Sequence, residues 1–219
     1  MKLLAAMVLG VGWAAAWSAC NESSAVVPAP AVPFHAQQGE IKFEGAKTCQ
    51  KCHYQEYSTW EKTAMAKAFT TLKPKEKVEI KKQKGMDPEK DYTKDAKCVE
   101  CHVTGYGKPG GYPAIVEGKE WTAEEKERAA RMEGVGCESC HGPGEKASVY
   151  KKDNKDYKWA DLAKLGAVHS DMRTCVPCHN NNSPTYKEFK FRETLGRDTH
   201  EIFNLKRDHE CDHKHAEGK

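Results

Sequence analysis

A five-residue pattern, Cys-x-x-Cys-His, occurs four times in this chain. The copies are numbered along the chain as motif 1 (Cys49, Cys52, His53), motif 2 (Cys98, Cys101, His102), motif 3 (Cys137, Cys140, His141) and motif 4 (Cys175, Cys178, His179). This pattern is the attachment sequence of a c-type haem. The four copies use eight of the ten cysteines, and a histidine directly follows every pair, which structural zinc sites do not require. The sequence therefore predicts four covalently bound c-type haems, with structural zinc as the alternative.

Each motif supplies both covalent and coordinate bonds to its haem. The two thiols form thioethers with the vinyl groups of one porphyrin, and the adjacent histidine is the proximal ligand of the iron. Glycines flank motif 3 on both sides, at Gly134, Gly136, Gly142 and Gly144. We expect these glycines to let the backbone pass close to the flat macrocycle.

The composition argues against a large apolar core of the protein's own. Only 38% of the residues are hydrophobic, whereas 31% are charged. Four porphyrins would supply much of the missing core, so we expect a mainly α fold in which helices and long loops wrap around the haems, with little or no sheet. The formal charge is +3 for the bare chain, and each ferric haem with ionised propionates adds about one negative charge. The basic residues are therefore not interpreted as a nucleic-acid surface.

The amino terminus has the features of a secretory signal. Residues 1–20 combine a basic start, an apolar run and a small-residue exit. Cys20 resembles a lipoprotein acylation site that would anchor the protein to a membrane, although Trp17 fits that signal poorly. Cleavage near Ala14 and a disulfide between Cys20 and Cys211 are the alternatives. Because c-type haems are attached outside the bacterial cytoplasm, we expect a periplasmic or other extracytoplasmic location.

Composition also divides the remaining chain. Residues 21–42 form a proline-rich linker, residues 43–205 the tetrahaem domain, and residues 206–219 a polar, histidine-rich tail. Within the domain, helical spacing of apolar residues predicts a helix from Tyr57 to Leu72 that ends before Pro74.

Three further local elements are expected. A capping-box pattern from Thr122 to Glu125 predicts a helix that continues to about Met132. A short helix over 158–165 should end at Gly166. The glycine-rich loop at 105–113 carries two tyrosines that we expect to pack on a haem face.

Two stretches closely resemble the tetrahaem cytochrome c-554 family of ammonia-oxidising bacteria, namely 91–112 around motif 2 and 134–144 around motif 3. The likeness runs over 43–205, including 60–68 and 189–191. The resemblance implies a mainly helical multihaem fold with closely stacked haem pairs and a role in electron transfer, with a hydroxylamine oxidoreductase as donor. It also implies three bis-histidine haems and a motif 2 haem whose iron lacks a sixth protein ligand.

Most electron-transfer haems have two axial protein ligands. His169 and His200 match family histidines in context, and Met65 stands where the family has a distal histidine, so we predict these three residues as distal ligands. A family histidine expected soon after motif 3 is absent, because 145–158 contains none. The alternatives are a core methionine and surface histidines. Weaker candidates are His35 in the linker and the tail residues His209, His213 and His215.

The sequence contains no phosphate-binding loop, Ser/His/Asp arrangement or carboxylate pair that suggests hydrolysis. We therefore predict an electron carrier between a donor and an acceptor protein, without catalytic residues. Two other functions remain as alternatives. One is reduction of a small ligand such as nitric oxide at a five-coordinate His102 haem. The other is a homo-oligomeric role as the subunit of an extracellular haem filament.

Overall fold

The computed structural model describes residues 40–191, 199–201 and 203. The predicted signal, nearly all of the linker and the whole tail lie outside the described residues, and so do Cys20, His35, Cys211 and the three tail histidines. No helix in the described ranges is both long enough and apolar enough to cross a bilayer.

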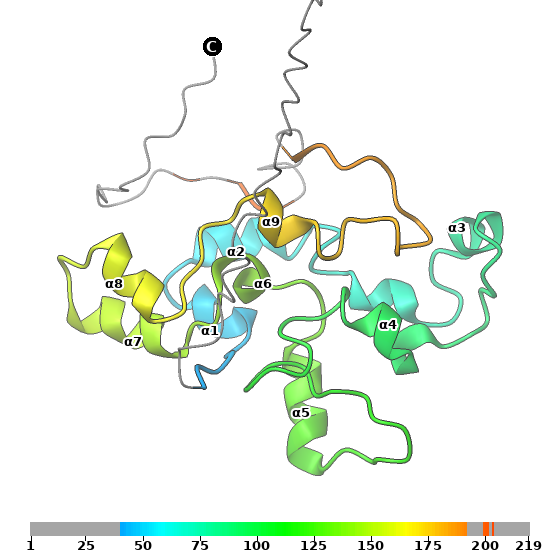
Figure 1. The fold of residues 1–219 in the computed structure, drawn as a ribbon, viewed down its shortest axis with the longest axis horizontal. Coiled ribbons are helices and arrows are strands. Elements are labelled where there is room, and N and C mark those ends of the chain that lie inside the picture. Colours follow the sequence, from blue (N-terminus) through cyan, green and yellow to red (C-terminus); the bar gives the residue numbers. More distant parts are fainter. Residues whose placement is uncertain (1–39, 192–198, 202, 204–219) are drawn as a thin grey trace, which may run out of the picture. The chain divides into compact units, whose positions relative to one another are not determined.

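Short helices joined by turns and long loops make up the described chain (Figure 1). They are α1 (Ala46–Gln50), α2 (Tyr54–Trp60), the 3-10 helix η1 (Phe69–Leu72), α3 (Val78–Gln83), the 3-10 helix η2 (Tyr92–Lys94), α4 (Ala96–Val99), α5 (Ala123–Arg131), α6 (Cys137–His141), α7 (Glu145–Asp153), α8 (Trp159–Lys164) and α9 (Met172–Cys175). Strand pairing in this part of the chain is limited to one isolated antiparallel bridge between Val103 and Glu133. The prediction of a mainly α fold with little or no sheet is confirmed.

Two helix ends follow their sequence signals. The Thr122 hydroxyl accepts a hydrogen bond from the Glu125 backbone N–H at 3.1 Å, and the Glu125 carboxylate accepts one from the Thr122 N–H at 2.9 Å. This is the predicted capping box, and it starts α5. Helix α8 ends before Gly166, whose φ of +94° suits glycine and terminates the helix.

The predicted helix from Tyr57 to Leu72 is interrupted. Helix α2 ends at Trp60, turns follow, and only Phe69–Leu72 resumes as a 3-10 helix. The Thr63 hydroxyl donates to the Trp60 carbonyl at 2.7 Å, and the Met65 carbonyl accepts from the distant Val135 N–H at 2.9 Å. Both bonds compete with the regular helical ladder, so local periodicity is overridden by side-chain and tertiary contacts.

A small apolar core surrounds motif 2. It consists of Phe69, Leu72, Tyr92, Val99, Val103, Tyr112, Ala129 and Met132. The ring of Tyr112 lies 5.7 Å from that of Phe69 and 5.3 Å from that of Trp121, centroid to centroid. Tyr112 therefore packs against protein rings, and the expected packing of the loop tyrosines on a haem face stays a prediction.

Candidate haem-binding site

Each motif begins on a short helix. Cys49 lies on α1, Cys98 on α4 and Cys175 at the end of α9, while motif 3 forms the whole of α6. In motifs 1 and 4, the histidine N–H donates to the carbonyl of the first cysteine, at 2.9 Å in both. One helical turn thus carries two thiols and an imidazole, as attachment to a single porphyrin requires.

The four motif imidazoles are suited to binding metal. Burial lowers the pKa of His53, His102 and His179, and it lowers that of His141 to about 4. These rings are therefore neutral at physiological pH, which is the form that binds a metal ion. His53, His141 and His179 nevertheless keep exposed surface that a flat prosthetic group can cover.

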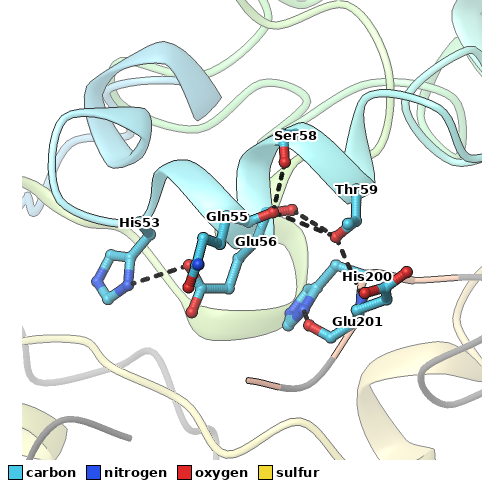
Figure 2. A network of polar contacts seen from close by, with 7 residues as sticks. All are labelled: His53, Gln55, Glu56, Ser58, Thr59, His200 and Glu201. Carbon is cyan, nitrogen blue, oxygen red and sulfur yellow. Dashed lines mark hydrogen bonds and ion pairs between the residues drawn. The ribbon is translucent and has the colours of Figure 1, made fainter. Parts of the chain in front are cut away.

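Acceptor oxygens orient several of the candidate imidazoles. The Nδ1 atom of His102 lies 2.7 Å from the Ala68 carbonyl oxygen, and the Nδ1 atom of His200 lies 2.7 Å from the Glu201 carbonyl oxygen. A carbonyl oxygen only accepts, so Nδ1 carries the proton and Nε2 presents its lone pair for iron. Figure 2 shows the His200 contact, and also His53, whose Nδ1 faces the Glu56 carboxylate at 4.0 Å.

His200 is brought to motif 3 by a contact with α2. The Glu201 N–H donates to the Thr59 hydroxyl at 3.1 Å (Figure 2). The imidazole rings of His141 and His200 have centroids 6.3 Å apart and planes inclined by 36°. A metal–imidazole bond is about 2 Å long, so two imidazoles on one iron have centroids about 6 Å apart. The spacing of this pair fits a shared iron.

The other predicted distal ligands have different surroundings. His169 lies beside motif 3, because the N–H of the preceding residue, Val168, donates to the His141 carbonyl at 2.9 Å. The His169 ring lies against the ring of Trp159, with centroids 3.6 Å apart. Met65 is half-buried, and its backbone pairs with Val135 just before motif 3. These contacts place both residues near motif 3 without pairing either with a particular motif histidine, so their ligation stays a prediction.

Glu138, inside motif 3, is a structural residue that the sequence reasoning missed. It is 4% exposed, and its carboxylate accepts hydrogen bonds from the backbone N–H groups of Glu44 (3.0 Å), Gly45 (2.8 Å) and Gly144 (2.6 Å). Burial raises its pKa, and the three donors oppose that shift. Glu138 thereby joins the entry of α1 to α6 and to the start of α7. The only signal in the sequence was a charged residue between two haem cysteines.

Protein segments explain the flanking glycines of motif 3. Gly134 has φ +82°, and a Cβ atom there would lie 2.3 Å from the Ala66 carbonyl oxygen. Gly142 has φ +80°, and its Cβ would lie 2.1 Å from the Gly166 carbonyl oxygen. Glycine is thus needed for close approach of two backbone segments. The expected approach of these glycines to a macrocycle stays a prediction.

The segment 134–136 is held from two sides. The Thr104 hydroxyl, which follows motif 2, donates to the Gly134 carbonyl at 2.9 Å and accepts from the Gly136 N–H at 2.8 Å. From the side of motif 1, the Trp60 indole N–H donates to the Val135 carbonyl at 3.0 Å. The approach to motif 3 is therefore positioned by residues that follow both earlier motifs.

Electrostatic interactions link thiols of different motifs. Four pairs are linked in this way: Cys49 with Cys137, Cys140 with Cys175, Cys140 with Cys178, and Cys101 with Cys178. The interaction of the first two raises the pKa of Cys49 and lowers that of Cys137. Helix contacts agree with this order, because α6 contacts both α1 and α9. In space, motif 1 is therefore next to motif 3, motif 3 next to motif 4, and motif 4 next to motif 2.

Comparisons with known proteins agree on one family. A family model described as cytochrome c554 and c-prime matches residues 48–142. Cytochrome c-554 of Nitrosomonas europaea is 41% identical over 150 residues, which are 65% of this chain and 59% of that protein, so the chain spans less than two thirds of that relative's length. The solved structure of reduced cytochrome c554 from the same organism matches with a TM-score of 0.60 and 35% identity, covering 77% of this chain and 89% of the other.

Proposed function

Because the chain belongs to the cytochrome c-554 family, we propose that it is a tetrahaem c-type cytochrome that transfers electrons between redox partner proteins. The thiols of motifs 1 to 4 would hold the haems, and His53, His102, His141 and His179 would be the proximal ligands. When bound, each haem supplies reversible one-electron exchange at its iron. The chain supplies the spacing, the axial ligands and the exclusion of water.

The observation that carries this proposal is that α6, which holds motif 3, contacts both α1 of motif 1 and α9 of motif 4, and the electrostatic links between thiols agree with that arrangement. Each thiol is an attachment point at a porphyrin edge, so motifs whose thiols interact would hold neighbouring haems. The interacting pairs link motif 1 to motif 3, motif 3 to motif 4 and motif 4 to motif 2. We infer a relay with motifs 1 and 2 at its ends and motif 4 as an obligatory interior step.

Axial ligation is the second part of the proposal. We assign His200 as the distal ligand opposite His141, supported by the 6.3 Å separation of their ring centroids. Two imidazoles keep an iron low-spin and limit rearrangement when its charge changes. His169 and Met65 remain candidates for other irons.

We further propose an extracytoplasmic protein with the domain organisation 1–20 signal, 21–42 linker, 43–205 tetrahaem domain and 206–219 tail. A hydroxylamine oxidoreductase-like protein is the donor that the family resemblance suggests. A lipid on Cys20 is the proposed membrane attachment.

The test uses holoprotein matured in a host that attaches c-type haems. Intact mass should show four added haems. Two double variants then compare an interior step with an end: Cys175→Ser with Cys178→Ser removes motif 4, and Cys98→Ser with Cys101→Ser removes motif 2. After rapid partial reduction, electron redistribution to the motif 2 haem should slow at least about tenfold in the motif 4 variant. The remaining three haems should equilibrate at the unsubstituted rate in the motif 2 variant.

Circular dichroism is recorded first, and both variants should give the spectrum of the unsubstituted fold. Redistribution to the motif 2 haem at the unsubstituted rate in the motif 4 variant would overturn the relay order. Fewer than four haems in the unsubstituted protein would overturn the tetrahaem assignment. Sustained nitric oxide consumption by the electron-fed protein would replace the carrier with the enzyme alternative.

A further inference from the structure

We propose that the amine of Lys151 is the distal axial ligand of the iron held by motif 1, opposite His53. The inference rests on the proposed haem attachment at Cys49 and Cys52. It concerns a nitrogen donor that is neither histidine nor part of any attachment motif.

Lys151 lies on the inward face of α7. Ala147, one turn earlier on the same face, is 8% exposed, and Lys151 is half-buried. Val149 on the other face is 58% exposed, and Lys152 is exposed as well. Residues four apart share a helix face, so Lys151 points toward the protein while its neighbour Lys152 points to solvent.

Helix α7 is fixed beside the chain that enters motif 1. The Lys42 N–H donates to the Glu145 carboxylate at 3.0 Å, and the Glu145 N–H donates to the Lys42 carbonyl at 3.3 Å. One turn further along, the Ser148 hydroxyl donates to the Glu44 carboxylate at 3.3 Å. Figure 1 shows α7 next to α1 in accordance with these bonds. Lys151 follows Ser148 by three residues and so lies on the turn that faces motif 1.

Electrostatics agree with this placement without deciding between the neighbouring motifs. The Lys151 ammonium group is the largest charged influence on His53 of motif 1, and it also acts on His141 of motif 3, where His200 acts more strongly. Burial lowers the pKa of Lys151, which favours the neutral amine. The aromatic ring of Tyr157 holds the terminal nitrogen at 5.6 Å from its centroid. On binding iron, the ammonium group would release one proton to solvent, and its lone pair would form the bond.

The two other candidate imidazole ligands in the described chain, His200 and His169, lie at motif 3. His200 is 6.3 Å from His141 between ring centroids, and it is the weakest of the charged influences on His53. His169 directly follows Val168, whose N–H donates to the motif 3 carbonyl of His141. Within the described ranges, Lys151 is therefore the nitrogen donor that the fold directs to the motif 1 iron. The competing role for this residue is an ion pair with a haem propionate, which charge alone would satisfy.

The test records low-temperature electron paramagnetic resonance and near-infrared magnetic circular dichroism of oxidised holoprotein, without any redox partner. Lys151→Ala should convert one low-spin haem to high-spin. Lys151→Arg should do the same, because guanidinium keeps the charge but cannot ligate. Lys151→His should restore the low-spin state with a bis-imidazole signature that differs from the unsubstituted spectrum. Lys152→Ala is the matched control and should leave the spectra unchanged.

Several results would overturn the inference. An unchanged low-spin count in both Lys151→Ala and Lys151→Arg would refute ligation. A spin change in the alanine variant that arginine prevents would assign Lys151 to a propionate instead. Intact mass and haem-peptide mapping are measured first, and a missing motif 1 haem would show that the failure lies in the proposed attachment rather than in the ligand.

Discussion

Replacing Glu138 by alanine should loosen the join between motifs 1 and 3. The substitution removes the acceptor of three backbone N–H groups, those of Glu44, Gly45 and Gly144. A buried donor without an acceptor costs about 1–3 kcal/mol. The Gly45 bond is buried and the other two are partly buried, so water can compensate part of the loss. Removing a carboxylate that burial already disfavours also offsets some of the cost, and we expect a net loss of about 3 kcal/mol.

The free energy of unfolding is measured by denaturant titration of holoprotein, followed by circular dichroism. Glu138→Gln keeps one acceptor oxygen and should cost about 1–2 kcal/mol. Glu100→Ala is the control, because Glu100 lies inside motif 2 but is exposed. A redox titration of Glu138→Ala should show altered potentials for the haems of motifs 1 and 3, since Cys49 and Cys137 lie on the two joined helices. A Glu138→Ala variant as stable as Glu100→Ala would refute the role assigned to the carboxylate.

The raised pKa of Glu138 fixes the sign of a pH dependence. The folded state binds this proton more readily than the unfolded chain. The stabilisation linked to it is therefore present below the ordinary glutamate pKa of about 4.3 and is lost as pH rises through the raised value. Glu138→Gln should accordingly cost more unfolding free energy near pH 4 than near pH 7, as paired denaturant titrations at the two pH values measure. A cost that increases with pH would contradict this reasoning.

Three further substitutions test separate contacts. Thr104→Val removes both hydroxyl bonds to the segment before motif 3 and should cost about 2 kcal/mol in denaturant titrations, whereas Thr104→Ser should recover most of this; equal losses in the two variants would refute the hydroxyl's role. In Gly134→Ala, the new Cβ is placed at a positive φ and 2.3 Å from a carbonyl oxygen, so the free energy of unfolding should fall by about 3 kcal/mol or more. Gly118→Ala is the control and should cost about 1 kcal/mol, because φ there is +75° and nothing lies within 4 Å. Similar losses in the two variants would argue against the close approach at Gly134. Thr59→Val removes the acceptor of the Glu201 N–H and should raise the high-spin fraction of one haem in electron paramagnetic resonance. Ser58→Ala loses only a bond within α2 and should not change the spectrum. An unchanged spin state in Thr59→Val would show that this contact does not support iron ligation.

Local signals in the sequence predicted the parts of this fold that depend on neighbouring residues. The capping box at Thr122 and the stop at Gly166 involve groups within four residues of each other, and both are confirmed. Helix α7 was missed because its sequence carries no apolar stripe, and Lys42 and Glu44 hold it from about a hundred residues away.

Long-range contacts determine the parts of the fold that local sequence signals did not predict. The Val135 bond to Met65 interrupts a stretch whose periodicity predicts one helix. In the sequence, Glu138 resembles an ordinary surface residue, because the backbone N–H groups that it accepts from, those of Glu44 and Gly45, are distant along the chain. The attachment residues were readable because covalent chemistry fixes their spacing. The residue opposite each iron is set by the fold, so sequence reasoning named candidates without pairing them.

The hydrogen bonds that hold residues 134–136 from two sides couple motif 3 to the two earlier motifs. Trp60 and Met65 hold this tripeptide from one side and Thr104 from the other. The position of motif 3 therefore depends on the regions that follow motifs 1 and 2. A substitution that displaces either region should also displace the cysteines and histidine of motif 3.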